Sequence, residues 1–309
     1  MRNNYIIKII ILLYFILILI DLPFKKNKFK FTKENKIYLD KYETNIYNNL
    51  MKTNFSERGC SQMWDNQREF LNGVIRKFKP KKILEIGVAE GGSSLIILNA
   101  IKDIKNSHLY SIDLSSNDKI GYCVRNLMKE DLNKWTLYTG NVVAKFIEEI
   151  GNNIDMVFID SAHLEPGEIL DFLITLPFLR EGAIVGFHDI GNQITHAGKN
   201  NTRREWAPYI IFNIIKGKKY LPSGNKILTH DIGAIKLERN QIKYIHDYCR
   251  AIGGQWQYFP KEMHIQLFRN IFNKYYDKEC NIIFEETVNF NRIFVKNNPL
   301  KNLYTYNSD

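Results

Sequence analysis

The sequence of 309 residues is poor in cysteine, and its few cysteines are widely separated. Pairs of the C-x-x-C kind, typical of zinc sites and redox centres, do not occur. The scattered thiols therefore favour a reducing compartment and argue against a zinc site. The four positions are Cys60, Cys123, Cys249 and Cys280.

Most of the chain has no excess of basic over acidic residues, although the formal net charge is +10. Residues 1–80 contain 15 Lys or Arg against 7 Asp or Glu, whereas residues 81–309 contain 28 against 26. A protein that binds nucleic acid needs a basic surface around its cleft. Because the larger part of the chain is nearly neutral, we do not expect nucleic acid to be a partner.

Long apolar runs are absent apart from one near the N-terminus. The run Ile9–Ile20 reaches about 18 residues, enough to cross a bilayer, if Lys8 extends to the interface. No small-x-small cleavage site follows it, which argues against a signal peptide. Six lysines between residues 25 and 36 predict that the body faces the cytoplasm. We expect residues 1–22 to anchor the protein to a membrane; a soluble cytoplasmic protein is the alternative.

The stretch KKILEIGVAEGGSS, residues 81–94, predicts a buried strand, a glycine-rich turn and a helix. Gly87 and Gly91 would let the backbone take left-handed angles and let a ligand approach. Dinucleotides and S-adenosylmethionine both bind at such turns. The carboxylate of Glu85 would repel a pyrophosphate, but it suits the cationic end of S-adenosylmethionine. A nicotinamide-dependent oxidoreductase stays the alternative.

Strands and helices alternate after this turn, and two short strands close the series. The pattern predicts an α/β fold, a Rossmann-like, doubly wound sheet of seven mostly parallel strands with an antiparallel terminal hairpin. An N-terminal apolar helix and a C-terminal extension flank it. Helices are expected near residues 63–78, 144–150, 165–179 and 203–216. The strands after the first are expected at residues 108–114, 135–142, 154–160, 182–189, 226–230 and 233–237.

Polar residues mark the ends of the expected strands, where ligands bind in open α/β sheets. Asp113 stands 26 residues after Gly87 and could accept both ribose hydroxyls of the cofactor. Asn141 would lie beside the adenine. A helix-capping carboxylate and an ordinary turn asparagine are the alternatives. Asp160 and Asp189 follow the fourth and fifth strands.

Two stretches carry a family resemblance. The glycine turn, with Ala89 between its glycines, resembles the first motif of class I S-adenosylmethionine-dependent methyltransferases. Asp160-Ser-Ala-His163 and His188-Asp189 resemble the branch of metal-dependent O-methyltransferases that act on small molecules and sugars. The resemblance runs from about residue 64 to residue 237.

The resemblance implies the roles of the strand-end residues. Asp160 and Asp189 would hold Mg²⁺ or another divalent cation, and Asp160 would also contact the cofactor. His163 would be the general base, and His188 its substitute or a structural partner. Some relatives add an Asn or Asp after the second metal ligand, where this chain has Ile190.

The expected activity is methylation of a hydroxyl on a small molecule or glycan. The chain lacks the (Asp/Asn)-Pro-Pro-(Tyr/Phe) motif used on nucleobase amino groups, and no cysteine follows a proline. A non-catalytic protein on the same scaffold is a further alternative, although the expected acids are all present. We expect a basic linker at residues 23–60, the methyltransferase domain at 61–238 and an aromatic-rich extension at 239–309.

Overall fold

The structure is a computed structural model that describes residues 36–37, 41–52, 60, 63–191, 206–222 and 231–297. All of these belong to one compact unit, residues 35–309. The predicted anchor at residues 1–22 and much of the predicted linker lie outside the described residues.

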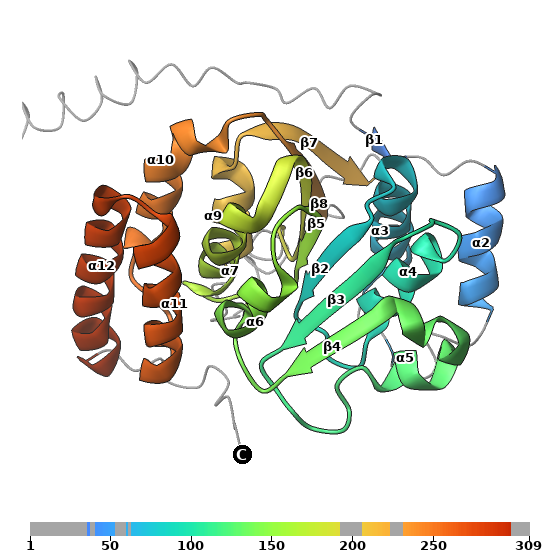
Figure 1. Ribbon diagram of the computed structural model, residues 1–309, viewed down its shortest axis with the longest axis horizontal. Coiled ribbons are helices and arrows are strands. Elements are labelled where there is room, and N and C mark those ends of the chain that lie inside the picture. The colour runs from blue at the N-terminus through green and yellow to red at the C-terminus, as the bar shows by residue number, and fades with distance from the viewer. Residues whose placement is uncertain are drawn as a thin grey trace, which may run out of the picture. The chain divides into compact units, whose positions relative to one another are not determined.

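Eight strands form one sheet in the order β1-β7-β8-β6-β5-β2-β3-β4 (Figure 1). β8 is antiparallel to its neighbours β6 and β7, and the other strand pairs are parallel. The predicted sheet, with its reversed last strand, is therefore confirmed, and the two-residue β1 extends its edge. The strands are β1 (Lys36–Ile37), β2 (Lys82–Ile86), β3 (His108–Asp113), β4 (Trp135–Thr139), β5 (Ile154–Ile159), β6 (Leu179–His188), β7 (Gly217–Pro222) and β8 (Ile232–Leu237).

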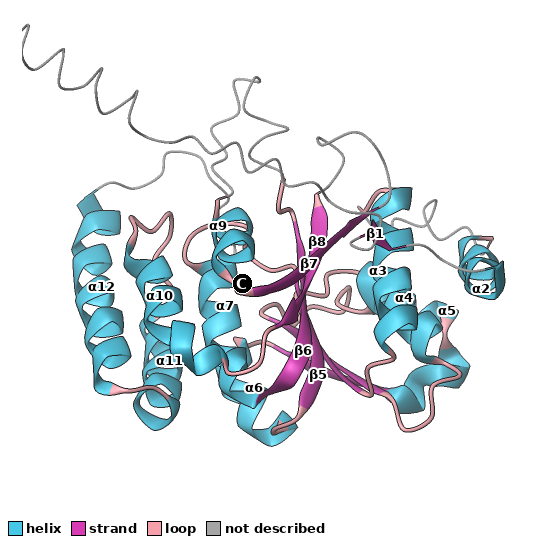
Figure 2. Ribbon diagram, turned by 90° about the horizontal axis from the view of Figure 1, so that it is seen from above, coloured by secondary structure: helices cyan, strands magenta, loops and turns pink. Residues whose placement is uncertain are grey.

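Helices cover both faces of the sheet (Figure 2). α2 to α5 pack on one face, and α6, α7 and α9 to α12 on the other. Because both faces are covered, the central strands are almost continuously apolar rather than alternating. The helices are α2 (Lys41–Met51), α3 (Asp65–Phe78), α4 (Gly92–Ile101), α5 (Tyr122–Leu127), α6 (Val143–Ile150), α7 (Gly167–Thr175), α9 (Ala207–Ile214), α10 (Ile245–Arg250), α11 (Glu262–Tyr275) and α12 (Lys278–Asn297), with short 3₁₀ turns η2 (Lys129–Lys134), η3 (Leu176–Phe178), η5 (Gln241–Tyr244) and η6 (Ala251–Gly253).

The terminal hairpin differs from the prediction in its first strand. The partner of β8 is β7, whereas the predicted strand at residues 226–230 lies outside the described residues. A Cβ on Gly217 would lie 2.4 Å from the carbonyl oxygen of Lys236, so only glycine allows this close approach of β7 to β8. Two lysines and a proline among the six residues of β7 make its strand pattern weak in the sequence.

The C-terminal helices α10, α11 and α12 share the core of the sheet's α6–α7 face. Tyr248 and Phe284 are fully buried there, and the hydroxyl of Tyr276 donates to the carbonyl of Leu173 in α7. The predicted boundary at residue 238 stays a prediction. The residues that follow it nevertheless pack as part of the same apolar core.

The four cysteines form two disulfides, Cys60–Cys123 and Cys249–Cys280, with Cα atoms 5.8 and 5.6 Å apart. No cysteine remains free. This pairing does not support the expected reducing compartment, because disulfides persist in oxidising surroundings. The partners are 63 and 31 residues apart in the sequence and meet only in the fold, so local spacing could not predict them.

The predicted membrane association needs a correction. Among the helices that the structure describes, none is long and apolar enough to cross a bilayer. Residues 5–22, on which the prediction was based, lie outside the described part.

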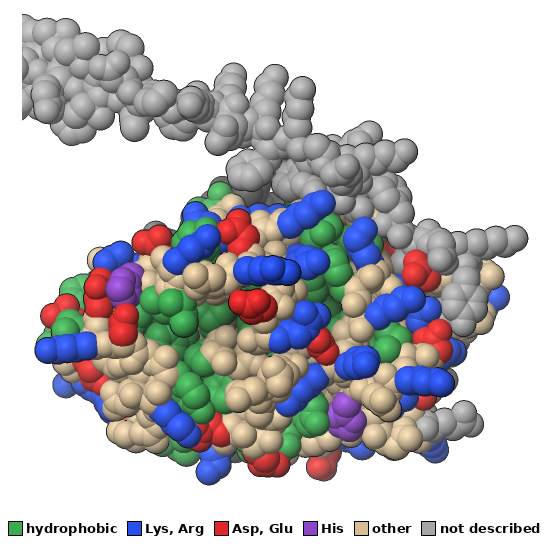
Figure 3. All heavy atoms as spheres, turned by 45° about the horizontal axis from the view of Figure 1, so that its top comes forward, with side chains coloured by type: hydrophobic (Ala, Val, Ile, Leu, Met, Phe, Trp, Pro, Cys, Tyr) green, Lys and Arg blue, Asp and Glu red, His purple; other side chains and the backbone are tan. Residues whose placement is uncertain are grey.

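Charges of both signs are mixed on the surface shown in Figure 3. Lys and Arg side chains alternate there with acidic, apolar and other polar groups. This mixture agrees with the near-neutral composition of residues 81–309.

Candidate active site

Five strands meet at one edge of the sheet, where they carry the site residues. β2, β3, β5 and β6 contribute their carboxyl ends, and the antiparallel β8 contributes its amino end. In Figure 1 the arrowheads of β2, β3 and β4 point toward this edge. The residues at or directly beside these strand ends are Gly87, Asp113, Asp160, Asp189 and Asp231.

The glycine turn after β2 is tightly built. Gly87 has a φ of +88°, and a Cβ there would lie 1.8 Å from the carbonyl oxygen of Asp160. Gly91, with a φ of +95°, is the N-cap of α4. Both angles favour glycine, and the missing side chain keeps the turn open to a ligand beside the first N–H groups of α4.

Asp113 holds the turn in place. Its Oδ2 accepts hydrogen bonds from the N–H groups of Val88 (2.9 Å) and Ala89 (3.0 Å), and its Oδ1 accepts one from Ser115 (2.8 Å). A carboxylate has about four acceptor positions, so it could still accept a hydroxyl of a ligand. The ribose contact stays a prediction.

Asn141 lies next to Asp113 along the edge, because the N–H of Gly140 donates to the Asp113 carbonyl (3.0 Å). Its Oδ1 accepts the N–H of Val142 (3.0 Å) at the start of α6. The side chain is half-buried. A contact with adenine stays a prediction.

Glu85 lies on the α4 side of β2 and is fully buried. Its carboxylate accepts hydrogen bonds, each of 2.6 Å, from the hydroxyls of Ser93, Ser94 and Ser111. These contacts join β2 to β3 and to the first turn of α4. The predicted contact with the cationic end of a cofactor remains untested, and the observed contacts favour a positioning role.

The four remaining predicted residues meet in one cluster, which we call the carboxylate–imidazole cluster: Asp160, His163, His188 and Asp189. Nδ1 of His163 lies 3.1 Å from Oδ2 of Asp189, and Nε2 of His163 lies 3.8 Å from Oδ1 of Asp160. Nδ1 of His188 lies 3.5 Å from Asp160 and 3.3 Å from Asp189.

Two members of this cluster have strained backbones. His163 and Asp189 have φ angles of +59° and +55°, in the left-handed region that side chains other than glycine rarely adopt. Such strain costs about 1–3 kcal/mol and persists where the surroundings impose it, as they do at functional sites.

Comparisons with known proteins find a match to the part of the chain that contains these site residues. Residues 84–190 match a family model described as a methyltransferase domain. This stretch is a methyltransferase domain. It begins within β2 and ends directly after Asp189, so it includes all the predicted site residues.

Similar solved structures include three described as methyltransferases. TomG, an O-methyltransferase from Streptomyces achromogenes, has 15% identity and a TM-score of 0.45 over 65% of this chain and 92% of TomG. An O-methyltransferase from Bacillus cereus has 14% identity and a TM-score of 0.47 over 67% and 96%. A putative caffeoyl-CoA O-methyltransferase from Staphylococcus aureus has 19% identity and a TM-score of 0.48 over 61% and 91%. No curated protein matches the sequence.

The charges in the methyltransferase domain's cluster stabilise one another. Burial alone would lower the pKa of His188, but Asp160 and Asp189 raise it well above its usual value. Burial likewise opposes the charge of Asp189, but His188 and then His163 lower its pKa. For His163, the carboxylates of Asp189 and Asp160 outweigh burial and raise the pKa. The carboxylates therefore stabilise the imidazolium that forms when a ring takes up a proton.

Two acidic residues of the site were missed in the sequence. Asp231 precedes β8, and its Oδ1 accepts the N–H of Gly191 (2.6 Å). Burial, and then the charge of Asp189, raise its pKa to about 7. Glu168 on α7 is fully buried and accepts the N–H of His163. An acid just before a reversed strand was the available signal for Asp231, since that strand begins where its parallel neighbours end.

A further acid lies on α7 near the cluster. Asp171 is buried there and accepts the hydroxyl of Ser161 (2.6 Å). Burial raises its pKa to about 7.

The cluster has donors suited to a divalent cation. Asp160, His163 and Asp189 each offer a ligand atom, and these atoms lie within 4.8 Å of one another. Among the described residues, buried Nδ1 of His163 and Nε2 of His188 have no hydrogen-bond partner. Carboxylate oxygens suit Mg²⁺, and an added imidazole suits transition metals. The residues fit a metal, and its presence stays a prediction.

Proposed function

We propose that this methyltransferase domain transfers the methyl group of S-adenosylmethionine to a hydroxyl of a small molecule or glycan. The observation that supports this most is the carboxylate–imidazole cluster at the end of β5 and β6. It adjoins the glycine turn, because Gly87 packs against the backbone of Asp160. Cofactor and acceptor could therefore bind side by side.

The glycine turn and Asp113 would hold the cofactor. Asp113 fixes the backbone of Val88 and Ala89 and would offer its remaining lone pairs to the ribose. Glu85 would support the turn without contacting the cofactor, because its hydrogen bonds join the first turn of α4 to β2 and β3. The missing Cβ of Gly87 keeps the backbone close enough for contact with a ligand.

His163 is the proposed general base. Its Nδ1 is buried beside Asp189, so Nε2 is the atom available to take the proton of the acceptor hydroxyl. Asp189 orients the imidazole and stabilises its charged form after proton transfer. The rest of the rate enhancement would come from holding the oxygen and the methyl carbon about 3–3.5 Å apart.

Asp160 and Asp189 would hold a divalent cation, Mg²⁺ by their oxygen donors. When bound, such an ion supplies Lewis-acid polarisation of an acceptor oxygen, a contribution of several kcal/mol. His188 lies between the same two carboxylates and could neutralise them instead. Chelation of metal distinguishes these two arrangements.

The test is an assay of methyl transfer from labelled S-adenosylmethionine to catechols, free sugars and glycans. We expect the wild type to bind S-adenosylmethionine but not NADH in calorimetry, and to methylate at least one acceptor class. His163→Ala should lose about 10²–10⁴-fold in kcat with cofactor binding unchanged. Glu286→Gln, an exposed carboxylate on α12, is the matched control and should keep full activity.

Three outcomes count against the proposal. NADH binding without S-adenosylmethionine binding would favour an oxidoreductase. Full activity of His163→Ala would remove its role as the base. Full activity in a chelator, with Asp160→Asn and Asp189→Asn active, would mean that His188 and not a metal neutralises the carboxylates.

A further inference from the structure

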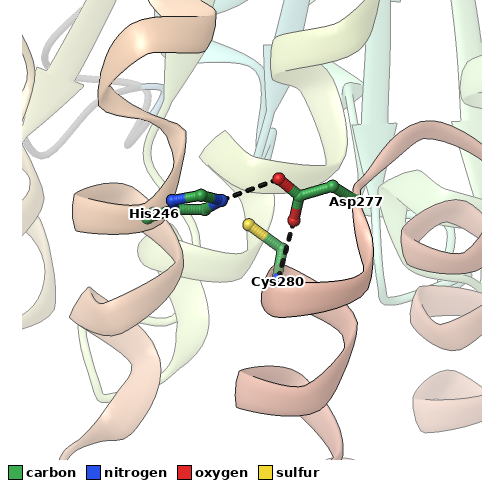
Figure 4. Close-up of side chains that lie close together, drawn as sticks. All are labelled: His246, Asp277 and Cys280. Atoms are coloured by element: carbon green, nitrogen blue, oxygen red, sulfur yellow. Dashed lines mark hydrogen bonds and ion pairs between the residues drawn. The ribbon is translucent and has the colours of Figure 1, made fainter.

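A second group of side chains that could bind a metal lies between the C-terminal helices, away from the methyltransferase residues. His246 and Cys249 are three residues apart on α10, and Asp277 and Cys280 are three apart at the start of α12. Residues at this spacing share one face of a helix. Figure 4 shows His246 of α10, Asp277 just before α12 and Cys280 in the first turn of α12 pointing toward one another.

The distances in this group are short. Nε2 of His246 lies 2.7 Å from Oδ2 of Asp277. The ligand atoms of His246, Asp277 and Cys280 all lie within 4.8 Å of one another. Cys249 joins the group through its disulfide with Cys280.

We propose that, when this disulfide is reduced, His246, Cys249, Asp277 and Cys280 bind one Zn²⁺. The donor set of two sulfurs, one imidazole and one carboxylate is complete for a tetrahedral structural zinc site. Two thiolates bound to one tetrahedral zinc at about 2.3 Å lie about 3.7 Å apart. Once the S–S bond is broken, both sulfurs become free to bind the same ion.

The surroundings of His246 support the assignment. Its Nδ1 lies 3.5 Å from Oε2 of Glu279, which also pairs with Arg250. A carboxylate on the second nitrogen of a metal-binding histidine fixes the ring and its tautomer. The two sulfurs are buried, whereas the side chains of His246 and Asp277 are 38% and 52% exposed. Zinc could thus enter from solvent and reach a sheltered sulfur pair.

The conversion is balanced. A dithiol reductant gives two hydrogens to the Cys249–Cys280 disulfide and becomes a disulfide itself. Each cysteine thiol then releases a proton as its sulfur binds Zn²⁺. The site connects α10 to α12 in both states, by a disulfide when oxidised and by zinc when reduced.

The experiment uses the full chain, reduced with a phosphine and titrated with Co²⁺ as a spectroscopic substitute for Zn²⁺. We expect one equivalent to give thiolate-to-cobalt charge-transfer absorption with the visible bands of a tetrahedral ion, and Zn²⁺ to displace it. The unreduced protein should give neither. A cation in the carboxylate–imidazole cluster has no thiolate ligand and cannot produce the charge-transfer band.

Variants locate the site. His246→Ala and Asp277→Asn leave the disulfide intact, and the asparagine can still cap α12. We expect each to weaken Zn²⁺ binding by at least about 100-fold, more than the loss of an outer partner causes. Asp247→Asn, an exposed acid on α10, is the matched control and should bind normally.

The Cys60→Ser/Cys123→Ser variant should keep the cobalt spectrum, because the other disulfide is not part of such a group among the described residues. A reduced wild type without the charge-transfer band would overturn the proposal. So would His246→Ala binding as tightly as the wild type, or loss of the band in the Cys60→Ser/Cys123→Ser variant.

Discussion

At the scale of single residues, Glu85 combines full burial with an ionisable group. Burial raises its pKa to about 7, although the hydroxyls of Ser111, Ser93 and Ser94 favour the charged form. In the unfolded chain a glutamate titrates near pH 4.3. The folded protein therefore binds a proton between these two values that the unfolded chain has released.

This difference predicts how the stability changes with pH. The contribution of Glu85 is fully present below about pH 4.3 and is lost as pH rises through about 7. The loss amounts to about 3 kcal/mol. We expect the wild type to lose this much stability relative to Glu85→Gln between pH 4 and 8, measured by urea unfolding. For the exposed Glu286→Gln the difference from wild type should stay constant, and equal curves for Glu85→Gln and wild type would contradict the prediction.

Sequence reasoning placed Asp160 and Asp189 together because the carboxyl ends of parallel strands share an edge. It could not place Asp231, which depends on the reversal of β8 and on a hairpin whose first strand was assigned incorrectly. The sequence also could not predict which face of β2 the Glu85 side chain occupies. β2 is buried on both faces, so its apolar pattern does not distinguish the α4 side from the ligand side.

At the scale of elements, α12 connects the predicted extension to the core. Phe284 is fully buried and stacks on Phe272 of α11, with ring centroids 4.4 Å apart, whereas Phe290 on the same helix is 53% exposed. The two phenylalanines are thus a matched pair in which only the burial differs.

Phe284→Ala should lower the free energy of unfolding by about 3–5 kcal/mol, through lost burial and a cavity. Phe290→Ala should change it by less than about 1 kcal/mol. Because α12 shares its core with α6 and α7, we expect one cooperative transition that moves as a whole in calorimetry. Two transitions, with only one shifted by Phe284→Ala, would instead mean that residues 239–309 form a separate domain.

The predicted order of elements was accurate where apolar runs were unbroken and poor where they were short. β5 and β6 are long and buried, so the composition identified them. β7 has two lysines among its six residues and depends on Gly217 for its close packing on β8, a tertiary contact that no local pattern contains.

At the scale of the whole molecule, the Cys60–Cys123 disulfide closes a loop of the chain that contains α3, β2, α4 and β3. In the chain-entropy description, a loop of 63 residues stabilises the folded state by about 4 kcal/mol. Cys60→Ala/Cys123→Ala should therefore lower the free energy of unfolding by about this amount in oxidising buffer. In reducing buffer the two proteins should differ little, and equal stability in oxidising buffer would show that the bond does not form.

The same loop changes how the chain responds to being pulled. A translocase that pulls the protein through a pore from either end would meet a covalent ring at Cys60–Cys123. It must then accommodate three polypeptide segments side by side, or the disulfide must first be reduced. The ring shortens the fully extended chain by about 220 Å, because its 63 residues would each add about 3.5 Å. The glycine turn and Asp113 lie inside the ring, so tension applied at the termini bypasses the very segment that would hold the cofactor.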